Sequence, residues 1–252
     1  MSQAMSSTGA PILQIKGVTK RFGGFVALDG IDLEVAEGER LGLIGPNGSG
    51  KSTLVNCICG TLANETGTVS FNGQSINGYP AHKRTHLGLA RSFQLPRPFA
   101  SMTVADNIRV PLLYTVRHRT GLVHSHIDLG RRCLEVLALV GLEHLAERSP
   151  RDLSQVDMRK LELARAVASE PRLLIADEAM AGLSHSEVED IIQLLLRLNA
   201  QGITVILIEH IMRAVMAFSQ RIAVLVSGRK IADGKPDEIV NNPEVVSAYL
   251  GQ

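Results

Sequence analysis

The sequence predicts an α/β protein built around a parallel sheet. Three apolar runs of strand length lie in its second half, at 173–176, 204–208 and 222–226, and a helical stretch at 186–199 separates the first two. A fourth such run, at 41–44, leads through a glycine-rich loop into another helical stretch. Uninterrupted apolar strands that alternate with helices are typical of sheets covered on both faces.

The bulk composition predicts a globular domain that folds without disulfides or structural metal. The chain has 252 residues, of which 45% are hydrophobic and 20% charged. A net charge of +1 provides no long-range attraction for nucleic acid, so no nucleic-acid partner is expected. Three cysteines are an odd number, which indicates free thiols and a cytoplasmic location. Cys57 and Cys59 lack the second pair that zinc requires and are interpreted as small core residues.

The first ninety residues are expected to add an antiparallel β subdomain to the sheet. Residues 1–11 are small, polar and uncharged and are predicted to form a flexible leader before a single domain at 12–252. The segments 12–16, 31–35 and 67–72 have strand-like patterns and are bounded by turn residues. No apolar run approaches the roughly twenty residues needed to span a bilayer, so membrane association would require another protein.

A helical subdomain is predicted at about 100–160, inserted into the core. Apolar residues recur there with helical spacing in a segment rich in arginine and glutamate. The same region contains a basic cluster. We interpret it as a solvated helical face, part of which contacts a partner protein, rather than as a nucleic-acid or metal patch. Its members are Arg117, His118, Arg119, His124, His126, Arg131 and Arg132.

The loop after the strand at 41–44 predicts a nucleotide site. It matches G-x-x-x-x-G-K-[ST] and lies between a strand and a helix, as such a loop must. Glycines leave backbone N–H groups free to surround phosphate oxygens, Lys51 reaches the β and γ phosphates, and the Ser52 hydroxyl ligates Mg²⁺. A chance glycine-rich turn is the alternative. The expected ATP-binding residues are Gly45, Pro46, Asn47, Gly48, Ser49, Gly50, Lys51, Ser52 and Thr53.

Two carboxylates follow the apolar run at 173–176. Asp177 is expected to contact the Mg²⁺ that accompanies ATP. Glu178, on the other side of the strand, is expected to polarise the water that attacks the γ-phosphate. Acidic pairs at strand ends are often solvated turns, but the phosphate loop in the same chain favours the catalytic interpretation.

Further segments resemble the ABC transporter ATPases from about residue 12 to 251. Arg91-Ser92-Phe93-Gln94 is similar to the family's Q-loop, whose glutamine touches the metal. Ile206-Leu207-Ile208-Glu209-His210 resembles the switch strand, which ends in a histidine near the γ-phosphate. The resemblance implies a P-loop NTPase core of RecA type with an antiparallel β subdomain and an inserted helical subdomain. It assigns catalytic roles to Gln94 and His210 beside Glu178.

Other segments extend the resemblance. Ala181-Gly182-Leu183-Ser184 resembles the D-loop of the dimer interface, and Phe22 matches the aromatic position that stacks on adenine, with burial as the alternative. The segments 88–94 and 241–251 resemble the ATP-binding subunits of branched-chain amino acid importers. That group transports branched-chain amino acids, other amino acids, amides or urea.

The signature segment departs from the family pattern. Relatives have a sequence close to L-S-G-G-Q, whereas this chain has Leu153-Ser154-Gln155-Val156-Asp157. Ser154 retains the hydroxyl that the family places on the partner's ATP. Val156 is unsuited to a positive φ, should the loop need one, and Asp157 adds negative charge near the phosphates. We therefore expect an asymmetric heterodimer with a second ABC ATPase subunit.

The resemblance also implies partners and a location. Two ATPase subunits would close on ATP, act on transmembrane permease subunits at the inner face of the membrane, and serve a solute-binding protein indirectly. Two alternatives are an ABC subunit that binds ATP with little turnover and a non-transport ABC ATPase. A P-loop kinase is disfavoured because no acceptor or lid element is recognisable.

Overall fold

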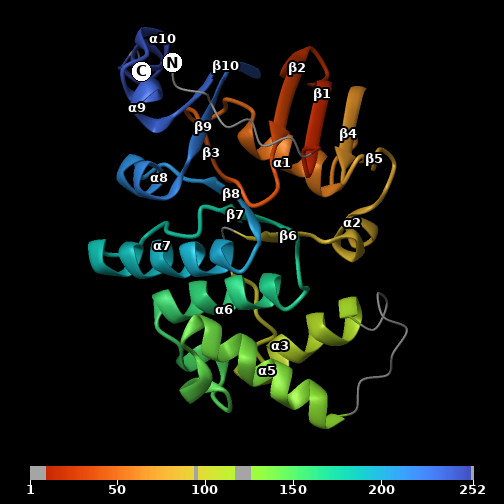
Figure 1. Cartoon of the computed structure of the whole chain (residues 1–252), viewed down its shortest axis with the longest axis vertical. Helices are drawn as coiled ribbons and strands as arrows, with labels where there is room; N and C mark the ends of the chain where they lie inside the picture. Colours follow the sequence, from red (N-terminus) through yellow and green to blue (C-terminus); the bar gives the residue numbers. More distant parts are fainter. Residues whose placement is uncertain (1–9, 94–95, 117–125, 251–252) are drawn as a thin grey trace, which may run out of the picture.

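In the computed structural model of the protein, residues 10–93, 96–116 and 126–250 are described. The chain forms a large mixed sheet, a smaller antiparallel sheet and a group of helices at the far end of the molecule (Figure 1). Most of the predicted leader, residues 1–9, lies outside the described residues. The extent of the helical subdomain, about 100–160, stays a prediction.

The large sheet has six strands in the order β10-β9-β3-β8-β7-β6. Its first five members in chain order pair in parallel, and β10 pairs antiparallel with β9. Every residue of β7 and β8 is buried, which explains their uninterrupted apolar sequences. The α/β prediction is confirmed. The strands are β3 (Arg40–Ile44), β6 (Leu89–Ser92), β7 (Leu173–Asp177), β8 (Thr204–Ile208), β9 (Arg221–Val226) and β10 (Arg229–Gly234).

The smaller sheet has four strands in the order β2-β1-β4-β5. It is antiparallel, as predicted, although β1 and β2 are longer than their sequence patterns indicate. Helix α1 (Lys51–Cys59) lies between the two sheets, where its apolar face, including Cys57 and Cys59, shares one core with both. The strands are β1 (Leu13–Phe22), β2 (Phe25–Val35), β4 (Thr66–Phe71) and β5 (Gln74–Ser75).

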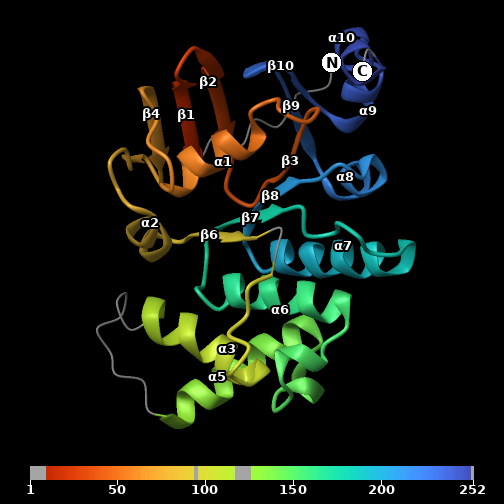
Figure 2. The ribbon, with the colours of Figure 1, turned by 180° about the vertical axis from the view of Figure 1, so that it is seen from behind.

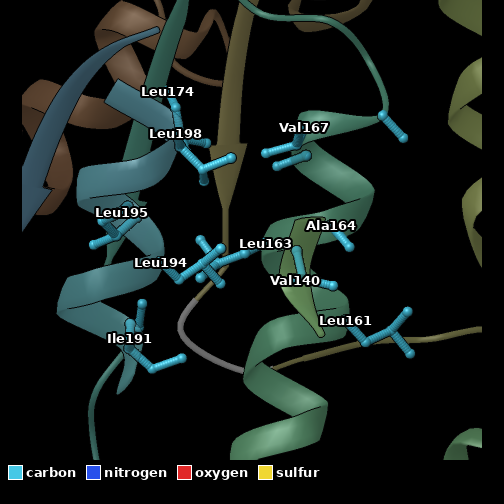
Figure 3. Close-up of a cluster of buried hydrophobic side chains, with 14 of the residues drawn as sticks. Val140, Leu161, Leu163, Ala164, Val167, Leu174, Ile191, Leu194, Leu195 and Leu198 are labelled. Atoms are coloured by element: carbon cyan, nitrogen blue, oxygen red, sulfur yellow. The ribbon is translucent and has the colours of Figure 1, made fainter. Parts of the chain in front are cut away.

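A second core lies between the large sheet and the helices. Figure 3 shows Leu163 and Val167 of α6 (Gln155–Val167) directed toward Leu194 and Leu198 of α7 (His185–Ala200). Beyond α6, the chain forms α3 (Val104–Pro111), the π-helical turn η1 (Leu112–Val116), α5 (His126–Val140) and 3₁₀ turns at Glu143–Leu145 and Pro150–Asp152. Of the basic cluster, 117–125 lie outside the described residues, and Arg131 and Arg132 pair with Glu135 and Glu170.

Short helices that the sequence pattern did not predict complete the fold. They are α2 (Ala81–Leu87), α8 (Met212–Phe218), α9 (Pro236–Val240) and α10 (Pro243–Leu250). Helices α9 and α10 lie beside β9 and β10 (Figure 2), and Ile239 of α9 and Val245 of α10 belong to the same small core as Ile44 at the end of β3. Among the described helices, none combines the length and apolarity needed to cross a bilayer.

Candidate active site

The predicted site residues converge because the parallel strands end at one edge of the large sheet. In register, Leu43 of β3 lies beside Ile208 of β8, which lies beside Asp177 of β7. The next strand, β6, places Ser92 beside Ala176. The loops that follow these strands therefore meet at that edge, where α/β proteins bind ligands.

The phosphate loop has the backbone that its glycines were expected to allow. Gly48 and Gly50 have φ values of 75° and 103°, in the left-handed region that favours glycine. A Cβ atom at Gly50 would lie 2.6 Å from the carbonyl oxygen of Ala27, so this position also requires the smallest residue. The loop then enters α1 at Lys51, whose N-terminal N–H groups point to the same edge.

The Lys51 side chain folds back over this loop. Its Nζ donates to the carbonyl oxygens of Gly45 at 2.6 Å and Pro46 at 3.0 Å. Burial lowers the pKa of the ammonium group, while the negative charges of Glu178 and Asp177 act in the opposite direction. The ammonium is thus held at the phosphate loop and faces both predicted carboxylates.

A cavity of about 480 Å³ adjoins the loop. Ser52, Asp177 and Glu178 all contribute to its wall, so three of the predicted residues share one space. Carboxylate and hydroxyl oxygens are ligands that suit Mg²⁺, and the donor set around the cavity fits that ion. Thr53 is half-buried in the first turn of α1, and Gln94, the remaining predicted ligand, lies outside the described residues. The lining comprises Ser52, Arg91, Phe93, Arg97, Glu162, Arg165, Asp177 and Glu178.

Asp177 is paired with an arginine that sequence analysis used only as a marker of the Q-loop. Oδ2 of Asp177 accepts from Nη2 of Arg91 at 2.5 Å and from its Nε at 3.2 Å. Nη1 of the same guanidinium donates to Oδ1 of Asn56 on α1 at 2.8 Å. Arg91 therefore connects β6, β7 and α1 beneath the cavity. A cationic residue directly after the apolar pair Leu89-Ala90 was the signal in the sequence.

Glu178 and His210 are in contact. Nε2 of His210 lies 2.8 Å from Oε1 of Glu178, and the two residues come from different loops. Glu178 has a φ of 49°, unusual for a residue with a side chain, and its backbone N–H donates to the carbonyl oxygen of Ile208 at 2.9 Å. The end of β8 thus holds Glu178 in a strained conformation that directs its carboxylate to the histidine.

Glu209, which was assigned no role from the sequence, directly precedes His210. Its side chain is only 3% exposed, and Oε1 accepts the backbone N–H of Met180 at 2.8 Å. Burial raises the pKa of Glu209 to about 7, although hydrogen bonds from the Met180 and His210 backbones oppose this. The available signal was a carboxylate directly after an apolar strand, the pattern that identified Asp177.

Phe22 lies at the tip of the β1–β2 hairpin. Its side chain is 51% exposed, which excludes burial as the reason for an aromatic residue there. The Nζ atom of Lys20 lies 5.5 Å from the ring centroid, and Phe25 beside it is exposed as well. An exposed aromatic pair with a cation is suited to stacking on a planar ligand. Contact with adenine stays a prediction.

The signature segment forms the start of α6. Ser154 is the N-cap of α6, and its hydroxyl donates to Oδ2 of Asp157 at 2.6 Å and accepts the Asp157 N–H at 3.2 Å. Val156 lies in the first helical turn, without a positive φ, and packs against the second core. Val156 would be strained only if the loop needed a positive φ there, and it does not, because an α-helical turn suits any L-residue. Ser154 is not among the described residues that line the cavity.

The predicted D-loop lies beside the signature segment. Nη2 of Arg159, on α6, donates to the carbonyl oxygen of Ala181 at 3.1 Å. Ser184 then caps α7 together with Glu187, whose carboxylate accepts the Ser184 N–H at 2.8 Å. Two segments that the sequence separates by about twenty-five residues thus form one surface next to Met180.

Comparisons with known proteins agree with this geometry. A family model described as "ABC transporter" matches residues 28–181, and one described as "Branched-chain amino acid ATP-binding cassette transporter" matches residues 229–252. The chain is 38% identical to the high-affinity branched-chain amino acid transport ATP-binding protein BraF of Pseudomonas aeruginosa, over 96% of this chain and 98% of the relative. It is 38% identical to LivG, of the same description, from Salmonella typhimurium, with the same coverage.

Solved structures agree as well. The ADP conformation of MJ1267, an ATP-binding cassette of an ABC transporter, superposes with a TM-score of 0.85 at 31% identity, covering 97% of this chain and all of that one. A nucleotide-free ATP-binding cassette from an ABC transporter gives a TM-score of 0.85 at 32% identity, covering 96% of this chain and all of that one.

Proposed function

Because the chain belongs to the ABC transporter ATPases, in their branched-chain amino acid group, we propose that it hydrolyses ATP to drive import of branched-chain amino acids or a related small polar solute. The observation that carries the hydrolytic role is the 2.8 Å contact between Glu178 and His210. It lies at the sheet edge that also carries the phosphate loop and Asp177.

The proposed reaction is in-line attack of water on the γ-phosphate. Glu178 accepts the proton of that water as the new P–O bond forms and the bond to the β-phosphate oxygen breaks. His210 orients the Glu178 carboxylate, and Lys51 exchanges its loop carbonyls for phosphate oxygens. Ser52 and Asp177 would hold Mg²⁺ together with Gln94, and the ion would neutralise phosphate charge. Phe22 would stack on the adenine.

The hydrolytic role is tested with Glu178→Gln, which keeps the shape of the side chain but cannot accept the proton. We expect Mg²⁺-dependent turnover to fall by about a hundredfold or more while ATP binding, measured with a fluorescent analogue, is retained. Arg172→Gln, at a surface ion pair with Glu37, is the matched control. Turnover close to that of the unsubstituted protein would contradict the assignment.

We further propose an asymmetric heterodimer with a second ABC ATPase subunit. The supporting observation is that the Ser154 hydroxyl is already bonded to Asp157, whose carboxylate would repel a γ-phosphate. This chain's own phosphate loop would then meet a glycine-containing signature from the partner. Permease subunits would hold the pair at the inner face of the membrane, where the region around 94–103 would transmit the cycle, and a solute-binding protein would deliver the cargo.

The heterodimer is tested by Mg²⁺-dependent ATPase activity of this chain alone and mixed with a companion ABC ATPase subunit. Activity confined to the mixture and lost with Glu178→Gln is expected. In a complex whose partner site is silent, Asp157→Gln should then raise turnover by about tenfold, because it removes the carboxylate that would repel the γ-phosphate. Equal activity of the isolated chain would contradict the heterodimer. Lasting inactivity in the mixture would favour a subunit that binds ATP without turnover.

A further inference from the structure

Glu209 is a buried carboxylate that the reaction as derived does not use. It lies at the end of β8, directly before His210, and its side chain is 3% exposed. Burying a charged group costs several kcal/mol unless it gains compensating contacts. Burying Glu209 therefore lowers the stability of the folded chain unless its contacts compensate, and those contacts indicate what it does.

Those contacts join the two loops that supply the hydrolytic pair. The loop after β7 is attached to the end of β8 at two backbone points: the Glu178 N–H bonds to Ile208, and the Met180 N–H bonds to Oε1 of Glu209 at 2.8 Å. The first bond is between main-chain atoms and exists whatever the side chains are. The second depends entirely on the carboxylate of Glu209.

The second bond lies two residues after Glu178 and therefore restrains the backbone conformation of Glu178. Backbone hydrogen bonds hold residues 178 and 180 on either side of Ala179, and the side chains of Ala179 and Met180 are buried. The turn is therefore restrained from rotating. This restraint holds Glu178 at its positive φ of 49°. If the bond to Met180 were lost, the turn could relax toward an ordinary φ, and Oε1 of Glu178 would move away from His210.

We propose that Glu209 is a positioning residue that holds the Glu178–His210 pair in its hydrolytic geometry through the backbone of Met180. The inference rests on the proposed ATPase mechanism and assigns Glu209 no contact with ATP. Two charged or titratable groups act on it, Glu178 and His210, with opposite effects on its pKa.

The test compares two substitutions in the full-length chain with its companion subunit. Glu209→Ala removes the acceptor and should lower kcat by about ten- to a hundredfold, with the KM for ATP changed less than about twofold, because misplacement affects the chemical step. Glu209→Gln keeps a carbonyl oxygen for Met180 and should retain kcat within about threefold at pH 6.

A matched control separates this role from general stability. Glu39, at the opposite end of β3, is another shielded carboxylate, and it accepts from Nε of Arg221 at 2.6 Å. Glu39→Ala should lower the melting temperature without changing kcat at 25 °C. A kcat for Glu209→Ala equal to that of the unsubstituted protein overturns the inference. If that variant does not fold, Glu209→Asp, whose shorter side chain withdraws the acceptor from the Met180 N–H, takes its place, and a kcat equal to that of the unsubstituted protein then overturns the inference.

The outcomes also distinguish this inference from the proposed function. If Glu178→Gln retains turnover, the hydrolytic assignment fails first. If Glu178→Gln is inactive while Glu209→Ala is fully active, only the role of Glu209 fails.

Discussion

At the scale of single residues, Arg91 is the cation that pairs with Asp177. Its guanidinium and the Asp177 carboxylate are both largely shielded, with side-chain exposures of 16% and 9%. Removing one member of a shielded pair leaves an uncompensated buried charge and lowers stability, whereas an ion pair in solvent contributes little to stability. The same carboxylate is a predicted metal contact, so Arg91 and Mg²⁺ offer it alternative positive partners.

We therefore predict that Arg91→Met lowers the free energy of unfolding by about 3 kcal/mol, measured by urea denaturation. Added Mg²⁺ with ATP should restore more stability to this variant than to the unsubstituted protein, because the ion supplies the missing charge. Arg172→Met, at an exposed ion pair, should change stability by less than about 1 kcal/mol. Equal effects of the two substitutions would contradict the prediction.

Glu209 gives stability a pH dependence of defined sign. Its pKa is about 7 in the folded chain and 4.5 in its ordinary state, so the folded chain binds the proton more tightly. That stabilisation is fully present below about pH 4.5 and is lost as the pH rises through about 7. The shift corresponds to roughly 3 kcal/mol.

The difference in unfolding free energy between the unsubstituted protein and Glu209→Gln isolates this contribution. In urea titrations at each pH, the unfolding free energy of the unsubstituted protein should fall relative to that of Glu209→Gln by roughly 3 kcal/mol between pH 5 and pH 8. A difference that stays constant over this range would show that Glu209 ionises normally.

Sequence analysis identified residues whose chemistry has a fixed local pattern. Lys51, Ser52 and Asp177 lie where a strand, a loop and a helix require them, and the structure brings Ser52 and Asp177 to one cavity. Arg91 and Glu209 were missed because their importance depends on burial and on partners distant in the chain, Asp177 and Met180. Those contacts exist only once the strands are in register.

At the scale of elements, the phosphate loop is limited by space as well as by conformation. Gly50→Ala would combine a left-handed φ with a contact to the Ala27 backbone that the sheet cannot relieve. ATP binding should weaken by about tenfold or more in this variant, measured by calorimetry. Gly73→Ala has a similar φ of 75° in open space and should bind ATP normally. Equal binding by both variants would show that the loop can move.

The elements themselves differ in how much of them the sequence predicted. The strands β7 and β8 and the helix α7 were recognisable because each has one strong apolar pattern. Strand β6 was missed because its four residues include an arginine. The C-terminal helices α9 and α10 are short and are stabilised by Ile44 and the rest of the third core rather than by their own periodicity.

At the scale of the whole molecule, the two sheets and the helices place the phosphate loop and the signature segment at different parts of the surface. Ser154 is not among the described residues that line its own chain's cavity, which favours the proposal that it acts on another chain. The sequence indicated this through the family resemblance alone, since composition and periodicity contain no information about a dimer.

The state of Ser154 leads to a prediction about assembly. ATP should join two chains only where a signature segment has its hydroxyl and backbone N–H groups available. Here the Ser154 hydroxyl is bonded to Asp157, whose carboxylate also places a negative charge at the N-terminus of α6. With Glu178→Gln to prevent hydrolysis, this chain should stay monomeric in ATP, measured by light scattering, and should dimerise when a companion subunit is added. Adding Asp157→Gln should allow it to form an ATP-dependent homodimer. If Glu178→Gln alone formed that homodimer, the Ser154–Asp157 bond would be shown to open readily, and two such chains would suffice for a closed ATPase pair.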